Sequence, residues 1–244
     1  MITLCKDKDT LLDTLELFSD CEYLRTMILL YLHSYGCTYD FAEFYLQLCD
    51  NDCTSVVLRY NNTVYVLCSE AADDAELYSF LCGFTGCEVF ANRDFTNGNI
   101  SFVSCCIFSK TGEESAAYSD VSQSLNPREV SELVCKDLDS NAKTEYFLNL
   151  SHMIRHNTLR VFCKYIDKKP VCAVSASCFN NKYSVINFAF TDSYFRGKGY
   201  CREVLDTLCS NLQTTYLLAC EQHNVPFYEK CNFTHISDCV KYNF

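Results

Sequence analysis

Proline and glycine are scarce in this chain, with three prolines and seven glycines among 244 residues. So few residues that interrupt regular structure predict many helices and strands joined by short connections. Long hydrophobic runs are lacking too: the longest, around Met27 to Leu32, falls far short of the roughly 18 apolar residues of a membrane-spanning helix. The opening residues, MITLCKDKDT, lack the basic, apolar and small-residue regions of a secretory signal. We therefore expect a cytoplasmic protein without a membrane partner.

Positive charge is in deficit, since 20 Lys and Arg stand against 31 Asp and Glu, for a formal net charge of -11. A surface of this sign repels a phosphate backbone, so nucleic acid is disfavoured as a partner, whereas a cationic or amine-bearing substrate is compatible. With 244 residues, 49% of them hydrophobic, the chain can form one large domain or two modest ones, each with a buried core.

The 19 cysteines never show the C-x-x-C spacing of zinc sites, and the aliphatic and aromatic content is too high for a small secreted disulfide scaffold. We interpret most of them as small buried hydrophobes in a reducing cytosol. Examples at positions where Ala, Val or Leu would serve are Cys68, Cys172, Cys209 and Cys220.

Two histidines, His152 and His156, lie four residues apart on a predicted helix. That spacing can hold a metal, but Met153 stands where a zinc protease has its glutamate, so a surface role is favoured. We predict no metal.

The first hundred residues show helices followed by strands. Apolar residues three and four apart predict helical structure from Thr10 to Gly36, continuing over residues 38–50. The further elements expected here are a hairpin of strands 54–60 and 63–69 turning at Asn61 and Asn62, a helix over 73–84, and strands over 87–91 and 100–109.

Residues 110–126 are polar and aperiodic, which predicts a surface connection. Asn126 as N-cap and Pro127 as first residue begin a helix that runs to residue 138. The elements expected after it are a helix over 143–156, strands over 159–166, 170–179 and 183–190 with turns at 167–169 and 180–182, a helix over 199–212, a strand over 215–220, a short helix near Pro226 and a strand over 236–244. This order predicts an α/β fold of α+β type, with a mixed sheet and helices on its faces.

Two of the seven glycines, Gly197 and Gly199, flank Lys198 between a strand and an apolar-periodic helix. Glycine allows positive φ and a close approach to the backbone, and the first amides of a helix attract anions. Arg196 and Lys198 add positive charge, so the segment is typical of a pyrophosphate site. A plain strand-to-helix turn remains the alternative. Neither the Walker sequence nor the three-glycine dinucleotide fingerprint is present.

The loop YFRGKGYC resembles that of the GCN5-related N-acetyltransferase (GNAT) family, Gln/Arg-x-x-Gly-x-Gly/Ala. Gly197 and Gly199 match its small positions and Arg196 matches a frequent variant, while Tyr194 stands where Gln or Arg is usual. A second segment, NVPFYEKCNF, is similar to the family's Asn-x-x-aromatic-Tyr-Glu-Lys-x-Gly-Phe. Its matching residues are Asn224, Phe227, Tyr228, Glu229, Lys230 and Phe233, and Asn232 replaces the glycine.

The resemblance covers residues 128–244 and implies a GNAT-like fold in the C-terminal half, with a domain over 99–244 whose first strand lies in residues 99–109. Residues 1–98 would form a smaller α/β accessory domain, which we interpret as a degenerate GNAT-like domain. By resemblance the co-substrate is acetyl-CoA, and its acyl group lies where strands four and five of the fold splay apart. The residues implied for coenzyme binding are Phe188, Ala189, Arg196, Gly197, Lys198, Gly199, Tyr200, Cys201 and Asn224.

Within this scheme Tyr228 is the expected proton donor to the departing thiolate, with ring packing as its alternative role. Glu221 is a candidate general base at the end of a strand; His223 and Asp192 are weaker candidates, and an amine can also lose its proton through water. The helix position of Cys201 is compatible with a lowered pKa, but we give its thiol no nucleophilic role.

The function expected is an acetyl-CoA-dependent N-acetyltransferase whose amine acceptor, a small molecule or a peptide, attacks the thioester directly. The alternatives are a non-catalytic CoA-binding or interaction module and a related acyl or aminoacyl transferase. The acceptor's identity and the oligomeric state, with a homodimer as one option, stay open.

Overall fold

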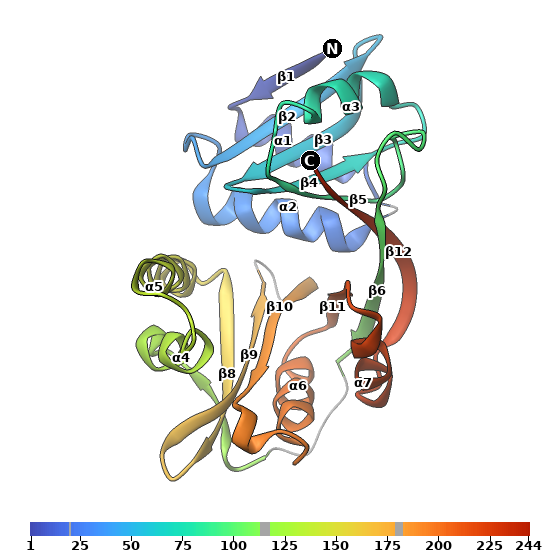
Figure 1. The fold of residues 1–244 in the computed structure, drawn as a ribbon. Coiled ribbons are helices and arrows are strands. Elements are labelled where there is room, and N and C mark those ends of the chain that lie inside the picture. Colours follow the sequence, from blue (N-terminus) through green and yellow to red (C-terminus); the bar gives the residue numbers. More distant parts are fainter. Residues whose placement is uncertain (20, 113–117, 179–182) are drawn as a thin grey trace. The chain divides into compact units, whose positions relative to one another are not determined.

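The computed structural model describes residues 1–19, 21–112, 118–178 and 183–244 (Figure 1). It divides into two compact units that are interleaved in sequence. The first unit contains Met1–Ile107, Leu218–Val225 and His235–Phe244, and the second contains Phe108–Leu217 and Pro226–Thr234. The domain boundary expected at residue 98 stays a prediction.

The first unit is built from the N-terminal elements and the last strand of the chain. Its elements are β1 (Ile2–Cys5), α1 (Lys8–Glu16), α2 (Glu22–Tyr35), β2 (Ala42–Cys49), β3 (Asp52–Tyr60), β4 (Thr63–Cys68), α3 (Asp74–Leu81), β5 (Glu88–Ala91) and most of β12 (Thr234–Asn243). The strand order is β1-β2-β3-β4-β5-β12. β4 and β5 are parallel, and β12 runs antiparallel to β5 with Val240 opposite Ala91. The C-terminal strand therefore completes the sheet that the N-terminal residues begin.

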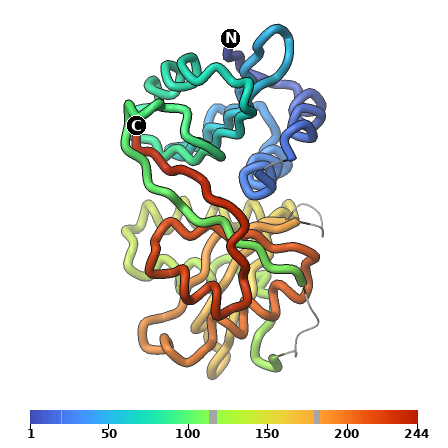
Figure 2. The backbone as a smooth tube through the Cα atoms, turned by 90° about the vertical axis from the view of Figure 1, so that its right-hand side faces the viewer, coloured from blue at the N-terminus to red at the C-terminus, as the bar shows by residue number. Residues whose placement is uncertain are grey.

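From α4 onward the second unit follows the order expected from the sequence, whereas the strand before α4 was not predicted. Its elements are β7 (Val121–Ser124), α4 (Pro127–Val134), α5 (Ser140–Arg155), β8 (Leu159–Ile166), β9 (Lys169–Ser177), β10 (Tyr183–Thr191), a 3-10 turn (Ser193–Phe195), α6 (Tyr200–Ser210), most of β11 (Thr214–Ala219) and α7 (Val225–Lys230). The strand order is β6-β11-β10-β9-β8-β7, where β6 (Val103–Thr111) enters from the first unit. Figure 2 shows β6 and β12 running beside each other, as neighbours in the strand order.

Helix ends are set by short polar side chains and by glycine. Asn126 caps α4, where its side chain accepts a hydrogen bond from the Arg128 amide and Pro127 occupies the first turn, as predicted. Gly36 ends α2 with φ 70°, again as predicted.

The mixed sheet with its helices confirms the predicted fold class. None of the helices among the described residues combines the length and apolarity that crossing a membrane requires.

Two predicted elements are wrong. Residues 38–50 do not continue a helix but contain β2, in which Ala42, Phe44 and Leu46 alternate toward the core. Pairing with β1 on one side and β3 on the other overrides the helical spacing of these apolar residues. The helix expected from Thr10 to Gly36 is also divided, into α1 and α2.

The expected connection over 110–126 contains β7, whose Val121 lies opposite Lys164 of β8. β7, and not residues 99–109, is therefore the edge strand next to β8, because β6 lies beside β11 instead. Residues 113–117 of this connection and the predicted turn at 180–182 lie outside the described residues. The turn at 167–169 is confirmed, with positive φ at Asp167 and Lys168.

The cysteines behave mostly as expected. All 19 carry free thiols. Cys68, Cys172 and Cys209 are buried in the core, and Cys220 is half-buried. The thiols thus replace small apolar side chains, with no disulfide framework among the described residues.

Candidate functional site

β10 and β11 separate in the middle of the second unit's sheet. Their parallel pairing joins Tyr183 to Thr214 and ends at Val185 and Tyr216, although β10 continues to Thr191. Beyond Val185 the edge of β10 that faces β11 has no strand partner there among the described residues. An open strand edge offers backbone N–H and C=O groups to an extended ligand.

A β-bulge sits where this separation begins. The register of β10 against β9 shifts between Ile186 and Phe188, so that Asn187 is the extra residue. The Asn187 side-chain oxygen accepts hydrogen bonds from the backbone amide of Ser177 at 2.8 Å and from its hydroxyl at 2.5 Å, which fixes the bulge. Phe188 and Ala189, the residues expected along a pantetheine arm, follow directly and are half-buried.

The glycine loop ends at the N-terminus of α6. Gly197 has φ 75° and Gly199 has φ 84°, a conformation that L side chains rarely adopt. A Cβ at either glycine would meet nothing within 4 Å, so the protein itself does not crowd the loop. Glycine is thus required here for backbone conformation, and the space beside it is open.

Most backbone amides of this loop have no hydrogen-bond acceptor within the part of the chain that the structure describes. In α6 the first intrahelical bond runs from the Glu203 N–H to the Gly199 carbonyl at 3.2 Å. Among the described residues, no acceptor is found for the N–H groups from Gly197 to Arg202, whereas that of Arg196 contacts the Ser193 carbonyl at 3.5 Å. Amides in this state at a helix N-terminus fit a bound diphosphate.

The two cations of the loop are exposed, but they differ in their contacts. The Arg196 Nε donates a hydrogen bond to the Thr191 carbonyl at 3.1 Å, which ties the loop to the end of β10. The Lys198 ammonium lies 5.0 Å from the centre of the Phe195 ring. Tyr194, at the position where the family has Gln or Arg, is 86% exposed. Of these two cations, Arg196 is therefore the one whose side chain is tied to the end of β10.

Two lysines with little exposed side-chain surface fix α6 in place. Lys164 of β8 forms ion pairs with Asp120 at 2.7 Å and with Glu203 in the first turn of α6. Lys110 of β6 pairs with Asp206 one turn later at 2.6 Å and also donates to the Cys231 carbonyl at 2.9 Å. These contacts set the direction in which the first amides of α6 point. Neither lysine stood out in the sequence, because nothing local distinguishes a buried lysine in a strand.

Gly112 is a further residue that the sequence analysis missed. Its amide donates to the Gln213 carbonyl at 2.9 Å. A Cβ at Gly112 would lie 1.9 Å from the Leu212 carbonyl oxygen, so the backbone passes directly against the end of α6. With only seven glycines in the chain, each one is a candidate for a position where a side chain would not fit, and this was the sequence signal for Gly112.

Tyr228 lies on α7 among aromatic rings, with Phe233 at 6.2 Å and Phe108 at 6.4 Å between ring centres. Burial, and then the nearby thiols of Cys201 and Cys231, raise the pKa of Tyr228 to about 12. The phenol therefore stays protonated at neutral pH. With this pKa it donates a hydrogen bond to a thiolate more readily than it releases its proton.

Asn232 follows α7 in the left-handed conformation, with φ 63°, which asparagine tolerates better than most non-glycine residues. The Phe233 N–H donates to the Tyr228 carbonyl at 3.1 Å and the Asn232 N–H to the Glu229 carbonyl at 3.0 Å. Asn232 therefore keeps the backbone geometry that glycine usually supplies, and Tyr228 is held by the closure of its own helix.

Glu221 and Asn224 lie in the Leu218–Val225 stretch, which belongs to the first unit. Glu221 is exposed and contacts His223 at 3.3 Å. The Asn224 side-chain amide donates to a Glu221 carboxylate oxygen at 3.3 Å. Asp192, in the second unit, forms an ion pair with Lys136 at 3.0 Å, and the Tyr194 amide and this lysine lower the pKa of its carboxyl, which weakens it as a base.

The thiol of Cys201 is not activated. Its hydrogen bond to Cys172 and its burial raise the pKa of Cys201, and the same hydrogen bond lowers the pKa of Cys172. The lowered pKa that the helix N-terminus suggested for Cys201 is therefore wrong. Its amide, not its thiol, belongs to the loop. The rings of His152 on α5 and of His156, the residue that caps this helix, are tilted by 32° with their centres 4.2 Å apart. Neither histidine joins a group of three metal-ligating side chains among the described residues.

Comparison with known proteins shows the fold. No family model matches the chain, and no curated protein matches it. A tandem GNAT protein from the clavulanic acid biosynthesis pathway matches with a TM-score of 0.61 at 11% identity, over 99% of this chain and 97% of that one. A GNAT-family acetyltransferase from Colwellia psychrerythraea matches with a TM-score of 0.61 at 12% identity, over 100% of this chain and 99% of that one. A Drosophila protein matches with a TM-score of 0.66 at 9% identity, over 99% and 98%.

The chain has a GNAT-like fold, as its C-terminal motifs led us to expect. Because the tandem protein is matched over nearly its whole length, the N-terminal part also takes part in the likeness, in keeping with two GNAT-like domains in tandem.

Proposed function

We propose that the protein is an acyltransferase that uses acetyl-CoA to acetylate an amine. The observation that carries this proposal is the set of unpaired amides from Gly197 to Arg202 beside the open edge of β10. When bound, acetyl-CoA supplies an acyl group already activated as a thioester.

The second unit supplies most of the residues that have a role in this proposal. The loop amides and Lys198 hold the diphosphate, and the N–H and C=O groups near Phe188 and Ala189 pair with the pantetheine amides. Tyr228 donates a hydrogen bond to the sulfur as negative charge develops there, since its phenol is protonated at neutral pH. Asn224 and Glu221, already in contact with each other, are proposed for coenzyme binding and for accepting the amine proton, respectively.

The acceptor we propose is a small-molecule or peptide amine, in keeping with the net charge of -11, which also disfavours nucleic acid and anionic membranes as partners. We further propose that the protein works in the cytoplasm, since 19 free thiols suit a reducing compartment.

A substitution at the loop tests coenzyme binding. Gly199→Ala places a Cβ where φ is 84° and disturbs the amides, so we expect at least tenfold weaker CoA binding in calorimetry. Gly86→Ala is the matched control, because Gly86 has φ 78° and open space around it but lies in the first unit. Equal CoA affinity in the two variants would contradict the proposed cradle.

A second candidate function is a non-catalytic CoA-binding module, favoured by the exposed Tyr194 and by the raised pKa of Tyr228. Release of free thiol from acetyl-CoA with a panel of primary amines and peptide N-termini separates the two candidates. CoA binding without amine-dependent thiol release would select the module. Stronger thermal stabilisation by a larger acyl-CoA than by acetyl-CoA would instead select a related acyltransferase.

A further inference from the structure

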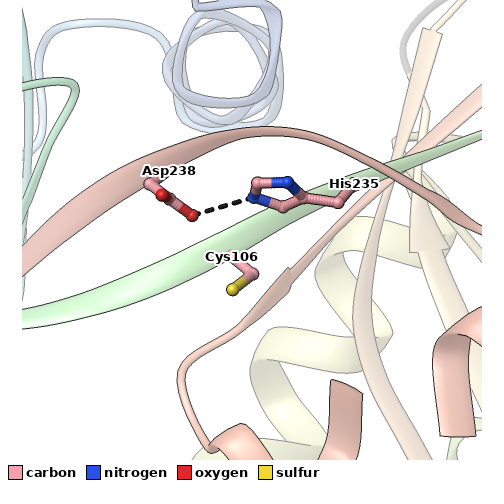
Figure 3. Close-up of side chains that lie close together, drawn as sticks. All are labelled: Cys106, His235 and Asp238. Carbon is pink, nitrogen blue, oxygen red and sulfur yellow. Dashed lines mark hydrogen bonds and ion pairs between the residues drawn. The ribbon is translucent and has the colours of Figure 1, made fainter. Parts of the chain in front are cut away.

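Three side chains with metal-ligating atoms converge in the first unit, away from the glycine loop in sequence. Cys106 lies on β6, and His235 and Asp238 lie on β12, its neighbour in the strand order (Figure 3). One ligand atom from each residue lies within 4.8 Å of the other two. The His235 Nε2 and the Asp238 Oδ1 are 2.9 Å apart. Among the described residues, these three form a group of metal-ligating side chains close enough to share one ion.

The three donors are those that zinc prefers. Thiolate, imidazole and carboxylate bind Zn²⁺ at roughly 2.3, 2.0 and 2.0 Å, which places tetrahedral ligand atoms about 3.3 to 3.6 Å from one another. The present separations therefore need only small side-chain adjustments. A thiolate and a carboxylate carry two negative charges, which neutralise one divalent cation, and the neutral imidazole adds none.

The surroundings of Cys106 also suit a cation. The alternation of β6 turns Cys105 into the core, where it is fully buried, and leaves Cys106 half-buried on the other face. The Gln222 side-chain amide approaches the Cys106 sulfur at 3.9 Å and supports a negative charge there. His235 and Asp238 are 47% and 55% exposed, so an ion can enter from solvent without unfolding.

We propose that Cys106, His235 and Asp238 form a zinc-binding site that links β6 to β12. Three protein ligands leave a fourth position for water. Binding replaces the Cys106 S–H bond with an S–Zn bond and releases that proton to solvent. Because β12 is the last strand of the first unit's sheet, the ion ties the C-terminal strand to the strand that leaves this unit. The site is independent of the proposed acetyl transfer.

Cobalt titration of the full-length protein, stripped with chelator, tests this site. We expect one equivalent of Co²⁺ to produce a thiolate-to-cobalt charge-transfer band, and Zn²⁺ to displace it with release of the bound Co²⁺. Cys106→Ser removes the band, and His235→Gln and Asp238→Asn each weaken binding at least about tenfold. Both of the latter positions are exposed, so these variants keep the fold.

The matched control is Cys82→Ser, which removes an exposed thiol elsewhere in the first unit. It should leave the band and the stoichiometry unchanged. Thermal unfolding provides a second readout: at a fixed Zn²⁺ concentration, the Tm of the wild type and of Cys82→Ser rises by more than that of Asp238→Asn. The proposal is overturned if no saturable band forms at millimolar Co²⁺, if the band persists in Cys106→Ser, or if Cys82→Ser also abolishes it.

Discussion

At the scale of single residues, the environment of Tyr228 decides which chemistry its phenol can perform. Burial among aromatic rings and two neighbouring thiols raises its pKa to about 12. The protonated phenol is the form that stabilises a thiolate, and a raised pKa extends that form to higher pH. A tyrosine in this site therefore acts as a hydrogen-bond donor over the whole physiological range.

Tyr228→Phe should lower kcat for amine acetylation by about 10²-fold while the KM for acetyl-CoA changes little. Steady-state thiol release measures both parameters. In the wild type, loss of the protonated phenol begins only as pH approaches 12, so no decline of kcat between pH 7 and 10 should come from Tyr228. A decline in that interval that disappears in Tyr228→Phe would contradict the assignment.

Asn232 shows that a departure from a motif can keep its geometry. Because its φ is 63°, Asn232→Gly should stabilise the protein by up to about 1 kcal/mol, and Asn232→Ala should destabilise it by about 1 kcal/mol. The urea midpoint at unchanged slope gives both values. Asn211→Gly is the control. At Asn211 φ is -93°, and the side-chain Nδ2 donates a hydrogen bond to the Thr207 carbonyl at 2.7 Å, so glycine should lower stability there.

At the scale of elements, the orientation of α6 depends on ion pairs that reach it from two strands. Lys164→Ala removes a side chain that is only 7% exposed and takes the ion-pair partner from Glu203. We expect this to lower the free energy of unfolding by about 2 to 3 kcal/mol. The loss of the pair with Asp120 adds little, because Asp120 is half exposed and screened by solvent. The same variant should bind CoA more weakly, since the α6 amides lose their support.

Arg202→Ala is the control on the same helix. Its pair with Asp206 is 3.7 Å long and Arg202 is 52% exposed, so we expect less than about 0.5 kcal/mol. Urea unfolding and calorimetry with CoA measure the two variants together. Equal effects of Lys164→Ala and Arg202→Ala would show that the buried pairs do not position the helix.

The sequence predicted elements well where local signals agree. The hairpin at Asn61 and Asn62 and the helix that begins at Asn126 are confirmed, because turn chemistry and capping are local. β2 and β7 were missed because their strand character comes from partners distant in the chain. The geometry of Gly197 and Gly199 was visible in the sequence, whereas Gly112 and Lys164 act through contacts that only the folded chain brings together.

At the scale of the whole chain, the GNAT-like motifs predicted the fold of the C-terminal half, but not the partner of the last strand. β12 pairs with β5 of the first unit, and no local property of residues 234–243 specifies that choice. The group of Cys106, His235 and Asp238 was not recognised in the sequence for the same reason. Strand pairing brings its members together, whereas their spacing along the chain does not.

Tyr242 measures how much this last strand contributes. It is fully buried, and its hydroxyl donates to an Asp94 carboxylate oxygen at 2.7 Å. Tyr242→Ala should destabilise the first unit by about 3 to 5 kcal/mol, and Tyr242→Phe, which loses only the hydrogen bond, by about 1 kcal/mol. Tyr194→Ala, at an exposed position, should change the urea midpoint little. A small effect of Tyr242→Ala would mean that the first unit is stable without β12.

Because β12 follows the segments of the second unit in sequence, the order of synthesis constrains folding of the first unit. A ribosome has made all the other strands of the first unit's sheet long before it reaches residue 234, and it must translate the second unit in between. During that interval the edge of β5 that later pairs with β12 lacks this partner strand. The sheet of the first unit is therefore started before the second unit is translated and completed only after it.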